Sequence, residues 1–203
     1  DTEDDADVSF VVTRAGNVGI GTTSPDQKLH LSNTAASTYM QVTGSSTGET
    51  ASDGMLFGTA GLTGKIINQE NANITINTNA LDVLTIEGTG SIGINNTDPT
   101  SSLDVNGSVA APILTKTSNY ALAYNDYTIL GDASSGNITI TLPTAVDVPG
   151  RIYIIKKIDA SANNVTIDGD GAETIDGVAT QTISTQYESF MIQSNGTAWF
   201  KLN

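Results

Sequence analysis

Few side chains of this sequence have the chemistry that catalysis requires. His30 is the single histidine among 203 residues, so one copy of the chain cannot assemble a Ser/His/Asp relay or a multi-histidine metal site. Alternation with Leu29 and Leu31 predicts that the His30 side chain faces solvent. Glycoside hydrolysis needs two carboxylates held across a groove, and the acids here are scattered without such a pair. We therefore predict a protein that is not an enzyme and uses no cofactor.

The acidic segment DGDGAE at residues 168–173 alternates oxygen-bearing side chains in the manner of a calcium-binding loop. The twelfth position counted from Asp168 is Ala179, not the bidentate glutamate of an EF-hand. A hairpin turn between residues 165–167 and 174–175 explains the same residues, because Asp-Gly pairs are ordinary turn formers. We predict a turn and no metal site, with Asp168 and Asp170 as the alternative ion ligands.

Two aromatic residues are candidates for contact with a binding partner. Tyr124 precedes Asn125 and Asp126 in a predicted turn and is expected to be the better exposed of the two. Trp199 lies in the last predicted strand, and tryptophan is highly buried on average, so we expect it to be partly buried. Both rings have the amphipathic character that suits stacking on a sugar.

The charge of the chain excludes several kinds of partner. The net charge is −14, from 22 acidic and 8 basic residues. The basic cluster of Arg151, Lys156 and Lys157 is too small to release counterions from nucleic acid, and an anionic membrane surface is disfavoured for the same reason. No run of apolar residues is long enough to span a bilayer. Arg151 and Lys156 are candidates for an anionic glycan, although such residues more often line a solvent-facing strand.

The elements that position these residues are predicted to be short β-strands. Only 38% of residues are hydrophobic and 5% aromatic, which is low for a single globular core. Disorder is one explanation, but it usually accompanies a higher charge than the 15% found here. Strand-sized runs separated by turn residues, such as residues 151–158 and 188–193, instead predict an all-β protein. We favour an elongated protein that buries its apolar rows against other copies of itself.

An internal repeat is the most informative feature of the sequence. GNVGIGTTSPDQKLHL at residues 16–31 matches GSIGINNTDPTSSLDV at residues 90–105. Val18 and Ile20 correspond to Ile92 and Ile94, and in both copies glycine alternates with the apolar residues. We expect the bare glycine face to admit backbones from neighbouring chains. Such a unit cannot bury its own apolar face, so it must stack on a neighbour or on another subunit.

The chain divides into three predicted parts. Residues 1–7 form an acidic, flexible start. Residues 8–110 form a repeat-built β-region, which ends at a hinge containing Ala110, Ala111 and Pro112. Residues 113–203 hold about eight predicted strands at a spacing of roughly ten residues, a rhythm typical of a β-sandwich or jelly roll.

Three segments together resemble bacteriophage tail fibres and related virus-encoded surface proteins. The first is GNVGIGTTSP at residues 16–25, which is followed by a lysine and alternating leucines. The second is IINQENA at residues 66–72, which leads to the strand at residues 84–86. The third runs from NDYTI at residues 125–129 through GRIYIIKK at residues 150–157 to TIDG at residues 166–169, and is similar to a domain found at fibre ends.

This resemblance implies a homotrimeric virion fibre that is located outside the cell. A β-shaft would wrap around a threefold axis with Val18, Ile20, Ile92 and Ile94 at its trimer core. A head, residues 113–203, would recognise a host surface glycan or an outer-membrane protein, and other virion tail proteins would hold the shaft. A bacterial cell-surface adhesin built from the same repeat is the alternative, and a polysaccharide depolymerase is the least favoured one.

Overall fold

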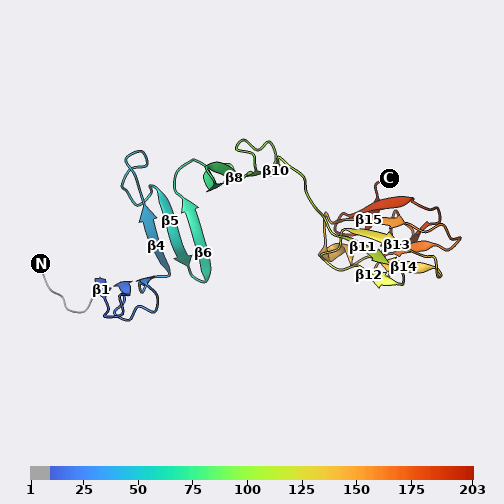
Figure 1. Ribbon diagram of the computed structural model, residues 1–203, viewed down its shortest axis with the longest axis horizontal. Coiled ribbons are helices and arrows are strands. Elements are labelled where there is room, and N and C mark those ends of the chain that lie inside the picture. The colour runs from blue at the N-terminus through green and yellow to red at the C-terminus, as the bar shows by residue number, and fades with distance from the viewer. Residues whose placement is uncertain (1–9) are drawn as a thin grey trace, which may run out of the picture. The chain divides into compact units, whose positions relative to one another are not determined.

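The computed structural model describes residues 10–203 and shows an all-β chain, as predicted (Figure 1). The described residues form strands β1 to β19 and a three-residue 3-10 helix, η1 (Ala145–Asp147). The acidic run at residues 1–7 lies outside them. None of the helical structure in residues 10–203 has the length and apolar character needed to cross a bilayer. Two compact units divide the chain, an N-terminal unit (Asp1–Ser108) and a C-terminal unit (Val109–Asn203).

The two sequence repeats fold into the same strand arrangement. In the first copy, β1 (Phe10–Val12) pairs antiparallel with β2 (Val18–Ile20), which pairs in parallel with β3 (Leu29–Leu31). In the second copy, β8 (Leu81–Ile86), β9 (Ile92–Ile94) and β10 (Leu103–Val105) pair in the same way, and β7 (Ile74–Thr78) adds to the edge of β8. The sequence repeat is therefore a structural repeat.

A separate antiparallel sheet lies between the two repeats in sequence. It contains β4 (Ser37–Val42), β5 (Met55–Ala60) and β6 (Thr63–Asn68). Gly61 adopts a φ of +57° in the tight turn that joins β5 to β6, a conformation that glycine adopts without steric cost.

The glycine face of each repeat is covered by its own chain. A Cβ on Gly19 would lie 2.3 Å from the carbonyl oxygen of Thr22, and one on Gly93 would lie 2.0 Å from that of Asn96. The loop after each strand thus folds back onto the bare face, so the expectation that neighbouring chains approach there is wrong. His30 is in register with Gly19 and shares this covered side. It is half-buried rather than solvent-facing.

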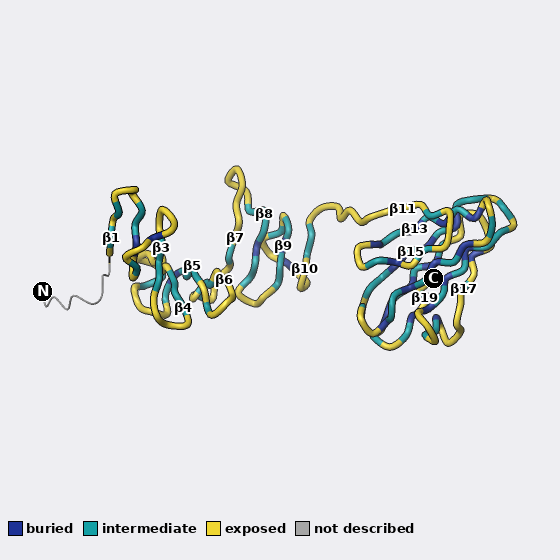
Figure 2. The backbone as a smooth tube through the Cα atoms, turned by 90° about the horizontal axis from the view of Figure 1, so that it is seen from below, coloured by how far each residue is buried: buried dark blue, intermediate teal, exposed yellow. Residues whose placement is uncertain are grey.

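The described part of the N-terminal unit has no apolar core. Its buried residues are three glycines, two prolines and one threonine: Gly19, Gly54, Gly93, Pro25, Pro99 and Thr85. Large apolar side chains are instead exposed, including Phe10 at 64% and Ile66 at 65%. Figure 2 shows this part as exposed and intermediate over most of its length, whereas buried residues are concentrated in the C-terminal unit.

The C-terminal unit is a short parallel coil of strands. The chain alternates between two sheets through β11 (Ile113–Lys116), β12 (Tyr120–Ala121), β13 (Thr128–Gly131), β14 (Ile138–Thr141), β15 (Ile152–Lys157) and β16 (Val165–Asp168). β11, β13 and β15 pair in parallel in one sheet, and β12, β14 and β16 pair in parallel in the other. Each pair of consecutive strands therefore makes one turn of a coil.

Three antiparallel strands complete the two sheets. β17 (Thr180–Ile183) joins β16, whereas β18 (Ser189–Ser194) and β19 (Trp199–Lys201) join β15. The result is a five-stranded sheet, β11-β13-β15-β18-β19, and an opposing sheet, β12-β14-β16-β17. A jelly roll is built from antiparallel strands, so the expected jelly-roll topology is not the one formed. The spacing of short strand-like runs in the sequence predicts where strands lie. It does not predict whether they pair in parallel or antiparallel.

The inward residues of the two sheets form one hydrophobic core. Ile129 and Ile155 from the five-stranded sheet and Ile140 and Ile167 from the opposing sheet are each 0% exposed. Complete burial of such a side chain stabilises a fold by about 1.5–3 kcal/mol. The C-terminal unit thus has the conventional core that the described N-terminal unit lacks.

Candidate functional site

The loop between β12 and β13 presents the most exposed aromatic side chain of the C-terminal unit. Tyr124 is 80% exposed and Asn125 beside it is exposed as well. The flanking residues point inward, because Leu122 is 6% exposed and Asp126 is 3% exposed. The loop is therefore anchored at both ends while its tip carries a phenol ring and an amide.

Asp126 fixes the backbone of this loop. Its Oδ2 atom accepts hydrogen bonds from the hydroxyl of Tyr120 at 3.0 Å and from the backbone N–H of Ala123 at 2.7 Å. Burial of a carboxylate destabilises a fold unless the carboxylate accepts hydrogen bonds such as these. One side chain thus ties the strand before the loop to the backbone of the loop at Ala123.

Arg151 supports the loop from the start of β15. Its Nη1 atom donates to the carbonyl oxygen of Tyr124, and its Cζ atom lies 6.0 Å from the ring centroid of Tyr153. The hydroxyl of Tyr153 reaches the carbonyl oxygen of Ala123 at 3.4 Å. Burial raises the pKa of Tyr153; the positive charge of Arg151 opposes that rise and the negative charge of Asp126 adds to it. Arg151 thus acts on the loop backbone.

The basic residues expected to form a cluster lie on different faces. Lys156 points outward from β15, and its Nζ donates to the carbonyl oxygen of Tyr187. Lys157 points into the unit and is 0% exposed. Successive residues of a strand face opposite sides, so two adjacent lysines cannot form one patch. Lys157 is therefore not part of a surface cluster, and the anionic-glycan contact expected from Arg151 and Lys156 stays a prediction.

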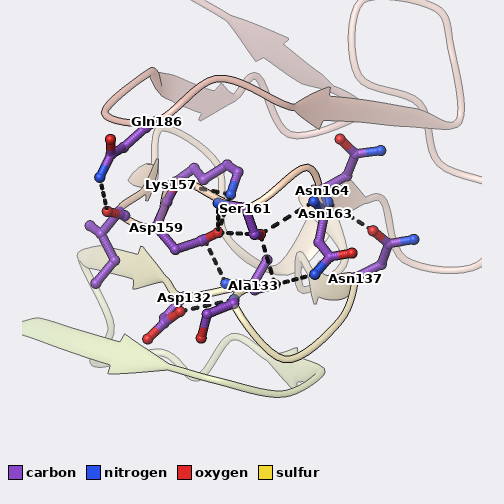
Figure 3. A network of polar contacts seen from close by, with 11 residues as sticks. Asp132, Ala133, Asn137, Lys157, Asp159, Ser161, Asn163, Asn164 and Gln186 are labelled. Atoms are coloured by element: carbon purple, nitrogen blue, oxygen red, sulfur yellow. Dashed lines mark hydrogen bonds and ion pairs between the residues drawn. The ribbon is translucent and has the colours of Figure 1, made fainter.

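Lys157 belongs to a buried polar network that sequence reasoning did not identify (Figure 3). Its Nζ pairs with the carboxylate of Asp159, which also accepts the backbone N–H of Ala133 at 2.7 Å and that of Ser161 at 3.0 Å. The side-chain amide of Asn163 donates to the carbonyl oxygen of Ala133 at 2.8 Å. These contacts tie the loop after β13 to the loop after β15. We interpret the network as structural, because its central charges are paired and closed off from solvent.

Trp199 is an interior residue and not a surface contact. Its side chain is 0% exposed, its Nε1 donates to the carbonyl oxygen of Pro143 at 3.2 Å, and its ring centroid lies 5.7 Å from that of Tyr153. The expectation of a partly exposed ring available to a receptor is therefore wrong. Trp199 is the inward residue of β19, at the edge of the five-stranded sheet, and its large ring fills the core there.

Asp168 and Asp170 do not share a hairpin turn. Asp168 is the last residue of β16 and is in register with Thr180 of β17. The hairpin partner of β16 is thus β17, and not residues 174–175 as expected from the sequence. Asp170 is exposed and begins a β-turn, in which the backbone N–H of Glu173 donates to the carbonyl oxygen of Asp170 at 2.9 Å, so the predicted turn does form. Within residues 10–203, His, Cys, Asp and Glu side chains do not gather in groups of three or more that could hold an ion.

The four residues expected at a trimer core are only partly covered in the single chain. Ile20 is 43% exposed, and Val18, Ile92 and Ile94 are half-buried. Val18 and Ile20 are in register with Leu29 and Leu31, and Leu29 is 52% exposed. Each repeat thus leaves an apolar face that is only partly covered, opposite to the glycine face that its own loop occupies.

No protein-family model matches this sequence, and no curated protein matches it significantly.

Proposed function

We propose that this chain is a structural and adhesive virion fibre protein, a homotrimer that recognises a host cell-surface receptor through its C-terminal unit. The observation that carries the proposal is the unequal distribution of burial. The C-terminal unit encloses a complete core, whereas residues 10–108 bury no aliphatic or aromatic side chain other than two prolines. A unit of this kind has insufficient burial to offset the conformational entropy of folding. It therefore requires other copies of itself.

The apolar faces of the repeats supply the contact between copies. Val18 and Ile20 in the first repeat and Ile92 and Ile94 in the second lie on equivalent faces, and each face is covered only in part by its own chain. Contiguous exposed apolar surface of this kind marks a protein interface. The number of three copies comes from the resemblance of the repeat to tail-fibre sequences. An elongated β-shaft carrying three heads is the assembly that these features support.

The loop at Tyr124 and Asn125 is the proposed receptor contact. Asp126 and Arg151 hold its backbone before a ligand arrives, so little conformational entropy is lost on binding. An exposed tyrosine and an amide suit a glycan or a protein surface. Three loops in one assembly allow each contact to be weak, because the second and third bind at high effective concentration.

The assembly is tested by the solution mass from light scattering coupled to size exclusion. We expect about three times the chain mass of 21.0 kDa and a large hydrodynamic radius. Replacing both Ile20 and Ile94 with aspartate places charges on the apolar faces and should release smaller species. Thr23→Asp with Thr97→Asp is the matched control, because these residues occupy equivalent exposed positions in the two repeats. A compact monomer for the unaltered chain would contradict the proposal.

The receptor contact is tested with labelled full-length chain on a panel of Gram-negative bacterial cells. Tyr124→Ala should abolish binding to the cells that the unaltered chain labels. Tyr187→Ala is the control, since Tyr187 is another exposed tyrosine of the same unit, at 62% exposed. Equal loss in both variants, or in neither, would argue against this loop. Genes for virion proteins next to the full-length gene would favour the fibre, whereas an export signal would favour an adhesin.

A further inference from the structure

The outer face of the five-stranded sheet carries large apolar side chains although it does not belong to the core, and the polar Thr115, Thr128, Lys156, Ser189 and Gln193 lie among them. Ile154 on β15 is in register with Thr128 on β13 and Met191 on β18, and these residues point away from the buried Ile155 and Ile192. The apolar side chains on this face come from all five strands: Ile113, Leu130, Ile152, Ile154, Met191 and Phe200. Phe200 is 41% exposed and Ile113 is 60% exposed.

The outer face of the opposing sheet has the reverse character. Thr139, Thr166 and Thr182 form one row across three strands, and Thr141, Asp168 and Thr180 form the next row. Hydroxyl and carboxylate groups keep this face hydrated. The outer face of the opposing sheet is therefore polar, whereas large apolar side chains lie on the outer face of the five-stranded sheet. Both sheets nevertheless bury isoleucine on their inner faces. A sheet face in contact with solvent normally carries polar residues, whereas parallel strands are normally covered on both faces. The apolar side chains on the outer face of the five-stranded sheet are therefore not accounted for by contact with solvent.

Charge separates the two faces as well. The five strands carry no aspartate or glutamate, since their sequences are ILTK, TILG, IYIIKK, SFMIQS and WFK. The whole chain has a net charge of −14, so two copies repel one another over most of their surfaces. A face free of carboxylates is where copies can approach at the lowest electrostatic cost.

We propose that the outer face of the five-stranded sheet packs against a second copy of this chain. The inference rests on the proposed assembly, because the repeats supply the association that brings two C-terminal units together. Five strands of this length cover roughly 400 Å² in projection, which is smaller than the roughly 800 Å² per partner of a standard interface. The contact is therefore weak alone and depends on the effective concentration that the N-terminal unit provides.

The proposal has a consequence for receptor binding. Lys156 lies on this outer face, so a second copy covers it and removes it from the residues available to a glycan. The threonine face stays in contact with solvent.

The test uses single cysteines, because the chain contains none of its own. Met191→Cys and Ser189→Cys place a thiol on the apolar face, and Thr166→Cys places one on the threonine face. All three positions are half-buried in the single chain, so their exposure to the reagent is similar before assembly. Ser189→Cys replaces one oxygen atom with sulfur, so it still tests the apolar face if Met191→Cys impairs folding. The rate of reaction with a bulky maleimide is measured on the full chain under two conditions. The first is a concentration at which light scattering shows the assembly, and the second is a dilution at which the assembly has dissociated.

In the assembly, we expect both cysteines on the apolar face to react at least about tenfold more slowly than the one at position 166, because reaction must wait for local opening. The difference should disappear on dilution. Equal rates in a confirmed assembly would overturn this interface while leaving the proposed fibre intact. Protection that persists in a monomer would also overturn it, because the chain itself would then cover the face. A chain that never assembles would contradict the proposed function instead.

Discussion

Lys157 and Asp159 form an ion pair inside the C-terminal unit, with side-chain exposures of 0% and 7%. A lysine at this depth is rare unless its charge is paired. Lys157 donates both to the carboxylate of Asp159 and, at 3.1 Å, to its carbonyl oxygen. The pair therefore holds the end of β15 to the loop that follows it, at the point where that loop also binds the loop after β13.

Removing the charge of Asp159 should destabilise the C-terminal unit. Asp159→Asn leaves the ammonium of Lys157 buried without a counter-ion, and loss of one partner of a buried pair costs about 3 kcal/mol. Urea unfolding followed by the fluorescence of Trp199, the single tryptophan, measures this change. Asp170→Asn at an exposed position should stay within about 0.5 kcal/mol. Equal midpoints for the two variants would show that the pair contributes nothing.

The same carboxylate should make stability depend on acid pH. Burial raises the pKa of Asp159, but the hydrogen bonds from Lys157, Ser161 and the backbone of Ala133 outweigh burial and hold it below the ordinary value. The unfolded chain has a pKa near 3.9 at this position, so it takes up a proton first as the pH falls. The contribution of this group is therefore complete above about pH 5 and is lost as the pH falls through 4 toward the folded-state pKa.

Urea midpoints at several pH values between 7 and 3 test this dependence. Other acids also titrate in this window, so the informative quantity is the difference between the unaltered chain and Asp159→Asn. That difference should be constant above about pH 5 and shrink below it. A difference that grows in acid would reverse the sign and contradict the depressed pKa.

The strands could be predicted from the sequence, but their pairing could not. Runs such as residues 151–158 and 188–193 are short and rich in isoleucine and aromatic residues, and they form β15 (Ile152–Lys157) and β18 (Ser189–Ser194). The direction of pairing depends on contacts between distant segments, as when Thr128 meets Ile154 across an intervening strand in the other sheet. Local patterning is the same for a parallel coil and for an antiparallel sandwich, so it cannot distinguish them.

The candidate site was predictable where turn chemistry determines it. Tyr124 precedes Asn-Asp in a turn and is exposed, as expected. Trp199 was harder, because alternation gives two faces without saying which one the core occupies. The adjacent lysines 156 and 157 carried a signal that could have been used. One of two successive strand residues must face inward, so one lysine required a buried partner, and Asp159 is the acid nearest to it in sequence.

Replacing the two aromatic candidates should have very different effects on stability. Trp199→Ala removes a fully buried ring that contacts Tyr153, and such a change costs about 3–5 kcal/mol. Tyr124→Ala removes an exposed ring and should change stability by less than about 0.5 kcal/mol. Thermal unfolding followed by far-ultraviolet circular dichroism measures both, because the first variant lacks the fluorescent reporter. Similar melting temperatures for the two variants would place Trp199 outside the core.

A methyl group at the repeat glycines should disrupt the N-terminal unit. In Gly19→Ala, the new Cβ would lie 2.3 Å from the carbonyl oxygen of Thr22, so the loop must move away from the strand. Displacement of this kind costs about 1–3 kcal/mol. Gly64→Ala is the control, since no heavy atom lies within 4 Å of a Cβ built there. Amide hydrogen exchange over residues 16–31 is the measurement, because the single tryptophan lies in the other unit.

We expect exchange in residues 16–31 to accelerate in Gly19→Ala and to remain unchanged in Gly64→Ala. Gly93→Ala should accelerate exchange in residues 90–105, because Asn96 occupies the equivalent position at 2.0 Å. The same variants distinguish between two explanations of what covers the glycine face of the repeat. If the glycine face met neighbouring chains instead of its own loop, Gly19→Ala would lower the mass of the assembly and leave the loop of a dissociated chain unaffected. If its own loop covers the face, the loop changes first, and exchange accelerates while the mass of the assembly stays the same.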